Sequence, residues 1–324
     1  MRRPPALVLT AGLGTRLRPL TYLRAKAAVP VNGQPLAVRV SAWLAAHGFV
    51  RQVLNLHHHP ATITAVLGDG SGVGAEVRYS WEQPVLGSAG GPRHALPLLT
   101  DAGDERFLIV NGDTLTDADL DALLAAHARA RALVTMALVP NPAPHKYGGV
   151  AVSGDGYVTG FTRRGAALDS YHFIGLQVVE SRAFAPLADG VPAESVGALY
   201  PSLIAQDPRS VAAFISDAAF HDIGTPGDCL RTSLHYASVE GSRLVAPSAR
   251  IAPDATVERT AVWDDVTIGA GARLVECIVG DGVHIPGGAS FERAAIVPAG
   301  ARTPAGDERI ERDLLVRPLD AGSR

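Results

Sequence analysis

The segment ALVLTAGLGTRLR (residues 6–18) joins a short apolar run to a glycine-rich turn that carries two arginines. The run Ala6–Leu9 has the composition of a buried strand. In parallel sheets, a glycine turn directly after a strand commonly leads into a helix, and ligands bind beyond the carboxyl ends of the strands. The segment therefore predicts an α/β fold with a ligand site at this turn.

Strand-like and helix-like segments alternate through the chain as far as residue 240. Short apolar or alternating runs predict further strands at 50–56, 77–81, 107–110 and 133–139. Segments with one apolar face predict helices at 35–47, 60–67, 91–99 and 120–131. This alternation indicates a Rossmann-like, mostly parallel sheet with helices on both faces, formed by residues 1–240.

After about Arg243 the helical periodicity stops and a six-residue period begins. Units that open on a branched or large apolar residue start, with two slips of register, at Val245, Ile251, Val257, Ile268, Leu274, Val279 and Ile285. Three such hexads make one coil of a left-handed parallel β-helix. We therefore expect a short β-helix of about three coils at residues 243–304, followed by a tail at 305–324.

The composition excludes several classes of protein. The net charge is −3 and 47% of the residues are hydrophobic, which argues against a disordered chain and against a general nucleic-acid or membrane-surface binder. No apolar run is long enough for a transmembrane helix. The two cysteines, Cys229 and Cys277, form neither a disulfide framework nor a zinc motif. We expect a cytoplasmic protein that binds neither nucleic acid nor membrane.

Charge is distributed unevenly along the chain. Residues 1–68 contain no acid, but they contain the basic residues Arg2, Arg3, Arg16, Arg18, Arg24, Lys26, Arg39 and Arg51. Chance in an arginine-rich composition is one interpretation, and a pocket for a polyanion such as a triphosphate is the other. The turn is not a dinucleotide fingerprint, because Leu17 stands at the third glycine, and no Gly-Lys-Ser/Thr of a Walker loop follows. It fits a backbone nest whose N–H groups hold phosphates.

Five ordered motifs span most of residues 6–235. They are LTAGLGTRLRPLT (9–21) with Lys26, LGSAGG (86–91), VNGD (110–113), YGGV (147–150) and HDIGTP (221–226). Together they resemble the sugar-1-phosphate nucleotidylyltransferases, or NDP-sugar pyrophosphorylases. The β-helix is similar to that of mannose-1-phosphate guanylyltransferases and ADP-glucose pyrophosphorylases. The chain departs from the family at Thr10, at Ala25, and at residues 161–165 (FTRRG), where the family has Phe-x-Glu-Lys-Pro.

The resemblance implies a role for each motif. The residues implied to bind the nucleotide are Ala11, Gly12, Gly14, Thr15, Gly87, Ser88, Asn111 and Gly112, with Glu82 as a candidate to read an edge of the base. Those implied to bind the sugar phosphate are Tyr147, Gly148, Gly175, Arg163 and Arg164. We expect one of the two arginines to reach the phosphate and the other to point to solvent. The alternative is that both are surface charges.

The implied reaction needs charge neutralisation more than proton transfer. A phosphate oxygen of the sugar phosphate attacks the α-phosphorus of an NTP and pyrophosphate leaves, so no general base is required. Arg16 is expected to stabilise the leaving pyrophosphate, and Lys26 the α-phosphate. Asp113 and Asp222 are expected to bind Mg²⁺, a hard cation that prefers oxygen ligands.

We therefore expect an enzyme that transfers a nucleoside monophosphate from an NTP to a sugar 1-phosphate, with GTP and mannose 1-phosphate as the first choice. One alternative is another pair, with glucose, heptose or amino-sugar 1-phosphate as acceptor. Another is a catalytically silent subunit that senses an NTP or NDP-sugar. The open edges of a short β-helix are normally capped or paired, so a homo-oligomer is also expected.

Overall fold

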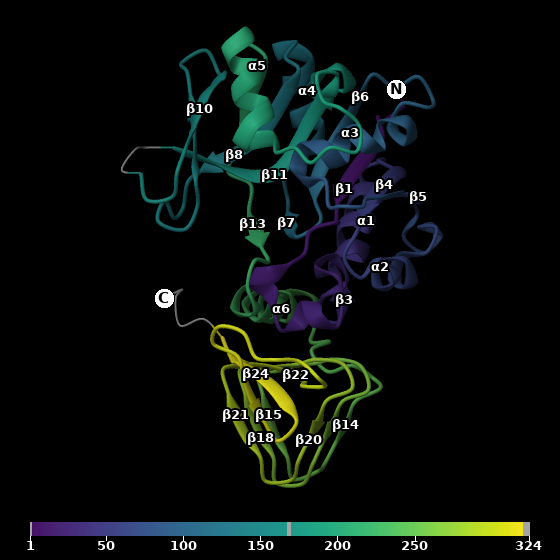
Figure 1. Cartoon of the computed structure of the whole chain (residues 1–324), viewed down its shortest axis with the longest axis vertical. Coiled ribbons are helices and arrows are strands. Elements are labelled where there is room, and N and C mark those ends of the chain that lie inside the picture. Colours follow the sequence, from purple (N-terminus) through teal and green to yellow (C-terminus); the bar gives the residue numbers. More distant parts are fainter. Residues whose placement is uncertain (1, 167–169, 320–324) are drawn as a thin grey trace. The chain divides into compact units, whose positions relative to one another are not determined.

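The computed structural model describes residues 2–166 and 170–319 of the chain (Figure 1). Their contacts divide the chain into two compact units, Met1–Gly12 with Arg39–Asp222, and Leu13–Val38 with Ile223–Arg324. The second unit therefore joins the arginine-bearing turn of the N-terminus to the C-terminal hexads. The domain boundary near residue 240 that the sequence predicts stays a prediction. The boundaries between the two compact units lie after residues 12, 38 and 222.

The first unit is built on a nine-stranded sheet (Figure 1). Its centre has the order β5 (Glu76–Trp81), β4 (Arg51–Leu56), β1 (Ala6–Leu9), β6 (Arg106–Asn111) and β11 (Tyr171–Glu180). The first four strands are mutually parallel and β11 is antiparallel to β6. Beyond β11 lie β8 (Val134–Pro140) with β12 (Val211–Ile215), and β9 (Gly149–Val152) with β10 (Val158–Thr162). This confirms the mostly parallel α/β sheet and brings the ends of β5, β4, β1 and β6 to one edge.

Helices predicted from apolar periodicity form close to the expected positions. They are α1 (Leu36–Ala46), α2 (Pro60–Leu67), α3 (Gly87–Leu99) and α4 (Leu120–Ala130), to which the structure adds α5 (Tyr200–Gln206). α3 begins four residues before the expected start at residue 91. Its first turn is fixed by tertiary contacts, because the N–H groups of Ala89 and Gly90 donate to the carbonyl of Ala193. The large side chains Phe107, Phe184 and Tyr200 are buried in the same core as the inner face of α3.

The second unit contains a left-handed parallel β-helix. It also contains the hairpin of β2 (Pro30–Val31) and β3 (Gln34–Pro35) and the helix α6 (Pro226–Glu240). The three sheets of the β-helix are β14 (Arg250–Ile251), β17 (Thr267–Ile268) and β20 (His284–Ile285); β15 (Thr256–Glu258), β18 (Arg273–Val275) and β21 (Ser290–Glu292); and β16 (Ala261–Val262), β19 (Ile278–Val279) and β22 (Ala294–Pro298). The β-helix expected from the hexads is confirmed (Figure 1).

One coil of this β-helix is one residue shorter than three hexads. Arg250 pairs with Thr267, and Thr267 pairs with His284, which is a spacing of 17 residues each time. The shortened corner follows the second strand of each coil. Arg259, Glu276 and Arg293 occupy that corner in successive coils with φ values of 48°, 52° and 49°. The tight left-handed corner accounts for the slips of register in the sequence.

The end of the chain extends the β-helix instead of leaving it. β24 (Leu314–Pro318) pairs antiparallel with β22, and β23 (Arg309–Glu311) pairs antiparallel with β24. Leu314 and Val316 join the core of the β-helix. The tail expected at 305–324 thus includes a hairpin that covers the outer edge of β22, and its residues 320–324 lie outside the described residues. The homo-oligomer expected from open edges stays a prediction.

Among residues 2–166 and 170–319, no helix combines the length and apolar character needed to cross a membrane.

Candidate active site

A buried hydrogen-bond network connects the carboxyl ends of β1, β4 and β5. The side-chain oxygen of Asn55 accepts from the N–H of Thr10 at 2.6 Å, and its Nδ2 donates to Glu82 Oε1 at 2.7 Å. The other carboxylate oxygen of Glu82 accepts from the N–H of Leu86 at 2.8 Å. Both Asn55 and Glu82 are buried. Glu82 therefore fixes the loop that begins the second glycine motif, and both of its carboxylate oxygens accept hydrogen bonds from the protein.

The second glycine motif packs closely against the segment 193–195. A Cβ on Gly87, whose φ is +78°, would lie 2.8 Å from the carbonyl oxygen of Ala193. Ser88 Oγ donates to Glu194 Oε2 at 2.8 Å and accepts from the N–H of Ser195 at 2.9 Å. Nothing in the spacing of the sequence indicated that Glu194 would meet this motif, because more than a hundred residues separate them.

Glycines also shape the end of β6. The N–H of Gly112 donates to the carbonyl of Leu9 at 3.0 Å, and a Cβ at this position would lie 2.8 Å from the same oxygen. Gly175 on β11 has φ +76°, and a Cβ there would lie 2.5 Å from Nδ2 of Asn111. The register of β11 against β8 shifts between Phe173 and Gln177, around this glycine. Gly175 thus makes room for the Asn111 side chain.

The two candidate metal ligands lie at a pair of neighbouring strands of the first unit, Asp222 in one strand and Asp113 directly before the other. β7 (Thr114–Thr116) pairs antiparallel with β13 (Phe220–Asp222), and Asp222 faces Thr114. Asp113 immediately precedes Thr114, so the two aspartates are one residue apart in the register of this pair. Two carboxylates fit Mg²⁺, which usually takes one or two protein carboxylates together with substrate phosphates and water. No cluster of three or more His, Cys, Asp or Glu ligands occurs in the described part of the chain.

Three aromatic side chains form a cluster at the strand that carries Asp222. The ring of His172 lies 4.2 Å from that of Tyr147 and 4.9 Å from that of Phe220, between centroids. Phe220 and Asp222 point to the same side of β13, because side chains alternate along a strand. Lys146 Nζ lies 5.1 Å from the centroid of Tyr147. The structure thus surrounds Tyr147 with His172 and Phe220, neither of which the sequence motifs had indicated.

Arg163 and Arg164 directly follow β10 and are both exposed. Residues 167–169 of the same connection lie outside the described residues. The expectation that one of these arginines reaches the sugar phosphate stays a prediction.

In the second unit, residues 13–26, here called the basic loop, fold tightly on themselves. Gly14 has φ +61°, its carbonyl accepts from Thr21 Oγ1 at 2.9 Å, and a Cβ on it would lie 3.2 Å from Cβ of Lys26. A Cβ on Gly224 would lie 3.3 Å from Arg16 Nη1. Glycine at position 224 therefore leaves room for the Arg16 guanidinium, which brings together the first and the last of the five motifs.

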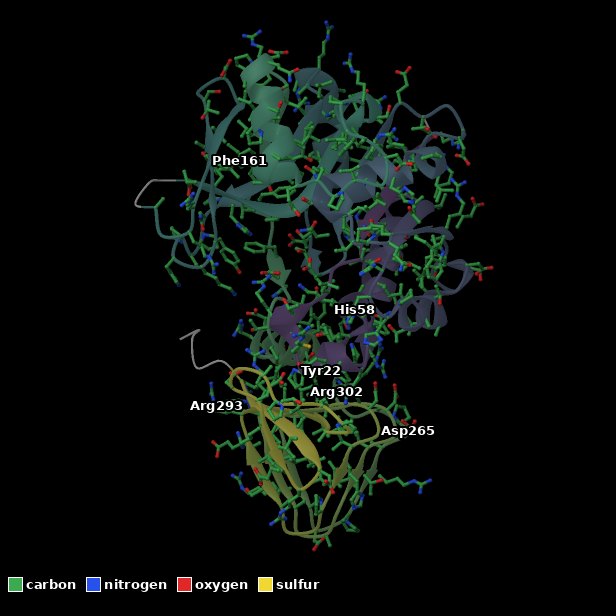
Figure 2. All side chains as sticks on the ribbon, in the orientation of Figure 1. Tyr22, His58, Phe161, Asp265, Arg293 and Arg302 are labelled. Atoms are coloured by element: carbon green, nitrogen blue, oxygen red, sulfur yellow. The ribbon has the colours of Figure 1, made fainter. Side chains whose placement is uncertain are left out.

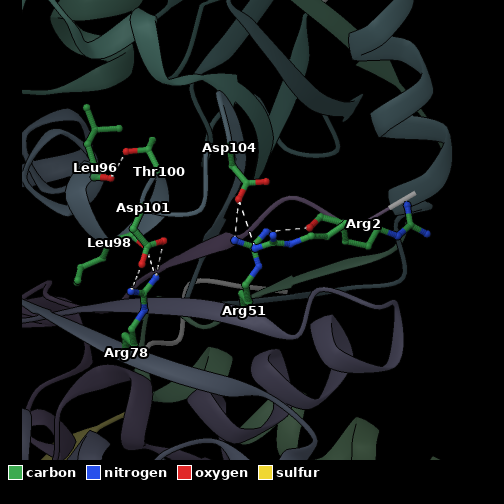
Figure 3. Close-up of polar contacts among 9 residues, drawn as sticks. Arg2, Arg51, Arg78, Leu96, Leu98, Thr100, Asp101 and Asp104 are labelled. Carbon is green, nitrogen blue, oxygen red and sulfur yellow. Dashed lines mark hydrogen bonds and ion pairs between the residues drawn. The ribbon is translucent and has the colours of Figure 1, made fainter.

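Several arginines of the acid-free stretch pair with acids from later in the chain. Figure 3 shows Arg51 beside Asp104, at 2.7 Å between Nη1 and Oδ2. Arg2 also approaches Asp104, and Arg3 pairs with Asp121. The interpretation of the whole stretch as a polyanion pocket was therefore too broad. Arg16 has no carboxylate within ion-pair distance in the described ranges, so the candidate phosphate contacts narrow to the basic loop.

Comparison with known proteins agrees with the fold and the motifs. Residues 5–239 match the family described as Nucleotidyl transferase, and residues 230–292 match the GlmU-like C-terminal hexapeptide family. A crystal structure of HddC from Yersinia pseudotuberculosis complexed with GMP-PN superposes with a TM-score of 0.63 at 20% identity, over 72% of this chain and 99% of that one. The chain belongs to the nucleotidyl transferase family.

Two relatives narrow the class further. Over 301 residues the chain is 30% identical to the mannose-1-phosphate guanylyltransferase of Mycobacterium tuberculosis, covering 89% of this chain and 83% of that protein. Over 201 residues it is 36% identical to the N-acetylmuramate alpha-1-phosphate uridylyltransferase of Neisseria meningitidis serogroup B, covering 61% of this chain and 83% of that protein. Within its family, the chain is an enzyme of the sugar-1-phosphate nucleotidyltransferase class.

The aromatic cluster leads to a prediction about pH. Burial lowers the pKa of His172 from 6.5 to about 4; a hydrogen bond with the Gly148 backbone opposes this, and the charge of Lys146 adds to it. His172 therefore binds its proton at a higher pH in the unfolded chain than in the folded chain. The resulting contribution to stability is complete above pH 6.5 and is lost as the pH falls from 6.5 towards 4. When the pH is lowered from 6.5 to 4, the free energy of unfolding should therefore fall less in His172→Phe than in the wild type. Denaturant unfolding at a series of pH values measures this difference.

A matched control is His284→Phe, at an exposed position of β20. It should follow the wild-type dependence on pH. Parallel curves for the wild type and His172→Phe would contradict the assignment.

Proposed function

We propose that this enzyme transfers GMP from GTP to mannose 1-phosphate, releasing pyrophosphate and forming GDP-mannose. The observation that carries the proposal is the similarity to a mannose-1-phosphate guanylyltransferase, which extends over 301 residues and so includes both the catalytic region and hexads of the β-helix. We assign Glu82 no role in recognising guanine, because its side chain is buried and its carboxylate holds Asn55 and the N–H of Leu86.

A second candidate is uridylyl transfer to the 1-phosphate of an amino sugar. It is favoured by the higher identity, 36%, to an N-acetylmuramate alpha-1-phosphate uridylyltransferase over a shorter stretch of 201 residues. The aromatic cluster of Tyr147, His172 and Phe220 supports either acceptor, because aromatic faces pack well against the C–H face of a pyranose ring.

In the proposed mechanism the protein binds and orients two anions and neutralises the charge that moves between them. A phosphate oxygen of the sugar phosphate forms a bond to the α-phosphorus as the bond to the β,γ-pyrophosphate breaks. Arg16 stabilises the charge that develops on the pyrophosphate, for which a planar guanidinium with paired donors is well suited. Lys26 supplies a compact charge at the α-phosphate. The nucleophile is ionised at neutral pH, so the chain needs no general base.

Asp113 and Asp222 would hold a Mg²⁺ ion. When bound, the ion would offset the negative charge of the phosphate groups and help to orient them. Asn111 ends β6, and Gly112 links it to Asp113. We propose that this turn contacts the nucleotide and that residues 147–148 line the side of the sugar.

The nucleotide and the sugar can be tested with a panel. Pyrophosphate release is measured for GTP, UTP, dTTP and ATP, each with mannose, glucose and N-acetylmuramate 1-phosphates. The highest kcat/KM should belong to GTP with mannose 1-phosphate. A higher value for UTP with the amino sugar would favour the second candidate, and no release with any pair would favour a silent sensing subunit.

Loss of either catalytic cation should be severe. Removing one preorganised donor to a developing anion typically lowers kcat by about 10²–10³, so Arg16→Ala and Lys26→Ala should each fall in this range. Arg2→Ala is the matched control from the same acid-free stretch, because Arg2 is exposed and lies near Asp104. A decrease of less than about tenfold in both test variants would argue against the assigned roles.

Metal dependence tests the aspartate pair. Turnover should stop in excess chelator and return with added Mg²⁺, and Asp113→Asn should abolish it without lowering Tm. Asp121→Asn, which changes an exposed aspartate on the following helix, should keep full activity. Full wild-type activity in excess chelator would refute the metal site.

A further inference from the structure

The C-terminal hairpin reaches the backbone of the basic loop. Arg317 on β24 donates from Nη1 to the carbonyl of Arg16 at 3.1 Å and to that of Arg18 at 2.7 Å. Its Nε donates to Asp307 Oδ1 at 2.8 Å, which fixes the orientation of the guanidinium. About 300 residues of sequence separate the two ends of this contact, and both belong to the second compact unit.

A stack around Tyr22 provides a second connection. The guanidinium carbons of Arg18 and Arg302 lie 5.2 Å and 5.3 Å from the centroid of the Tyr22 ring, and Figure 2 labels Tyr22 and Arg302 where they meet. The Tyr22 hydroxyl donates to Glu308 Oε2 at 3.4 Å. Glu308 is buried and also accepts from the N–H of Ala305 at 3.0 Å. The segment that leads into the hairpin therefore contacts the side chain of Tyr22 in the basic loop, whereas the hairpin itself contacts backbone carbonyls of the loop.

Arg24 attaches the far side of the basic loop to the β-helix. Its Nε and Nη2 donate to the two carboxylate oxygens of Asp281, both at 2.6 Å, and Nη2 also donates to Asp264 at 2.6 Å. Asp264 and Asp281 occupy the same position in successive coils, one 17-residue repeat apart. Two acids of the β-helix therefore pair with one of the arginines of the acid-free stretch.

The basic loop needs such external support because its own structure is short. Residues 15–17 form a single 3-10 turn, in which Leu17 N–H donates to the Gly14 carbonyl at 2.9 Å. Turns of this length are marginal without tertiary contacts. The planar peptide group ties each carbonyl to the N–H of the next residue. Holding the Arg16 carbonyl therefore also fixes the N–H of Leu17, and with it the backbone that carries the Arg16 side chain.

We propose that Arg317 is a positioning residue for nucleotidyl transfer: by holding the carbonyls of Arg16 and Arg18, the C-terminal hairpin sets the conformation in which Arg16 meets the leaving pyrophosphate. Asp307 keeps Arg317 in place. This inference rests on the proposed role of Arg16. It assigns the hairpin of β23 and β24 a task in catalysis besides covering the edge of the β-helix.

The test combines hydrogen–deuterium exchange with steady-state kinetics on the full chain. In Arg317→Ala, amides of residues 13–24 should exchange faster, while peptides of the nine-stranded sheet should not change. kcat should fall by about 10²-fold, the effect of a small misplacement of a catalytic group, with KM for the sugar phosphate unchanged. Arg317→Lys retains one charged donor for the carbonyls and should recover part of both effects.

Arg309→Ala is the matched control, because Arg309 lies in the same hairpin on β23 and pairs with Glu311. It should leave exchange and kinetics as in the wild type. Should Arg317→Ala fail to fold, Asp307→Asn is the milder variant, with smaller changes expected in the same direction.

The outcomes separate this inference from the proposed function. Unchanged exchange in residues 13–24 would overturn the anchoring, and faster exchange with an unchanged kcat would overturn the positioning role. A wild type that releases no pyrophosphate with any substrate pair would refute the proposed function. The exchange difference would still decide whether Arg317 anchors the loop.

Discussion

The hydrogen bond between the Asn55 amide and the Glu82 carboxylate is the contact on which the edge of the sheet depends. A buried carboxylate is tolerated only where donors replace its water, and here one oxygen takes Asn55 and the other the N–H of Leu86. Asn55 also holds the backbone N–H of Thr10. One cluster thus fixes the ends of β1, β4 and β5 together with the approach to α3. A Cβ on Gly91 would lie 2.5 Å from Glu82 Oε1, so the glycine motif is as much a requirement of this cluster as of a ligand.

The residues assigned to the reaction fall into two sets by charge and by compact unit. The carboxylates Asp113 and Asp222 belong to the unit of the nine-stranded sheet, whereas Arg16 and Lys26 belong to the unit of the β-helix. The reason is the order of segments along the chain: residues 13–38, which lie between β1 and the main part of α1, belong to the second unit, whereas β1 and most of α1 belong to the first. The β-helix is therefore a structural partner of the loop that carries the cations, and Arg24 and Arg317 are the side chains that join them.

The parts of the structure that follow from local patterns could be predicted from the sequence. Strands such as 107–110 and helices such as 60–67 appear where apolar periodicity places them, and the hexads predict the β-helix. In the sequence, the coil of 17 residues appeared only as slips in the six-residue period. The residue that closes the short corner has a left-handed conformation in each coil, but its type differs from coil to coil, so no sequence signal marks it. The network around Asn55 and the acids that neutralise Arg24 and Arg51 were not predictable. They depend on which side chains meet across the fold, and no spacing along the chain records such contacts.

The 17-residue coil restricts how this domain can change in length. An insertion of one full coil keeps Leu274 and Phe291 stacked on apolar neighbours and returns the corner of Glu276 to its left-handed position. Any other insertion within a strand of the stack turns inward-facing residues towards solvent, as a slipped register does in any sheet with one buried face. The stacked strands can therefore gain or lose length only in whole repeats. A repeat added before Asp264 would leave the Asp264–Asp281 pair and the final hairpin unchanged relative to each other. It would place one more coil between that pair and Arg243, whose N–H donates to the Asn32 side chain at 2.8 Å.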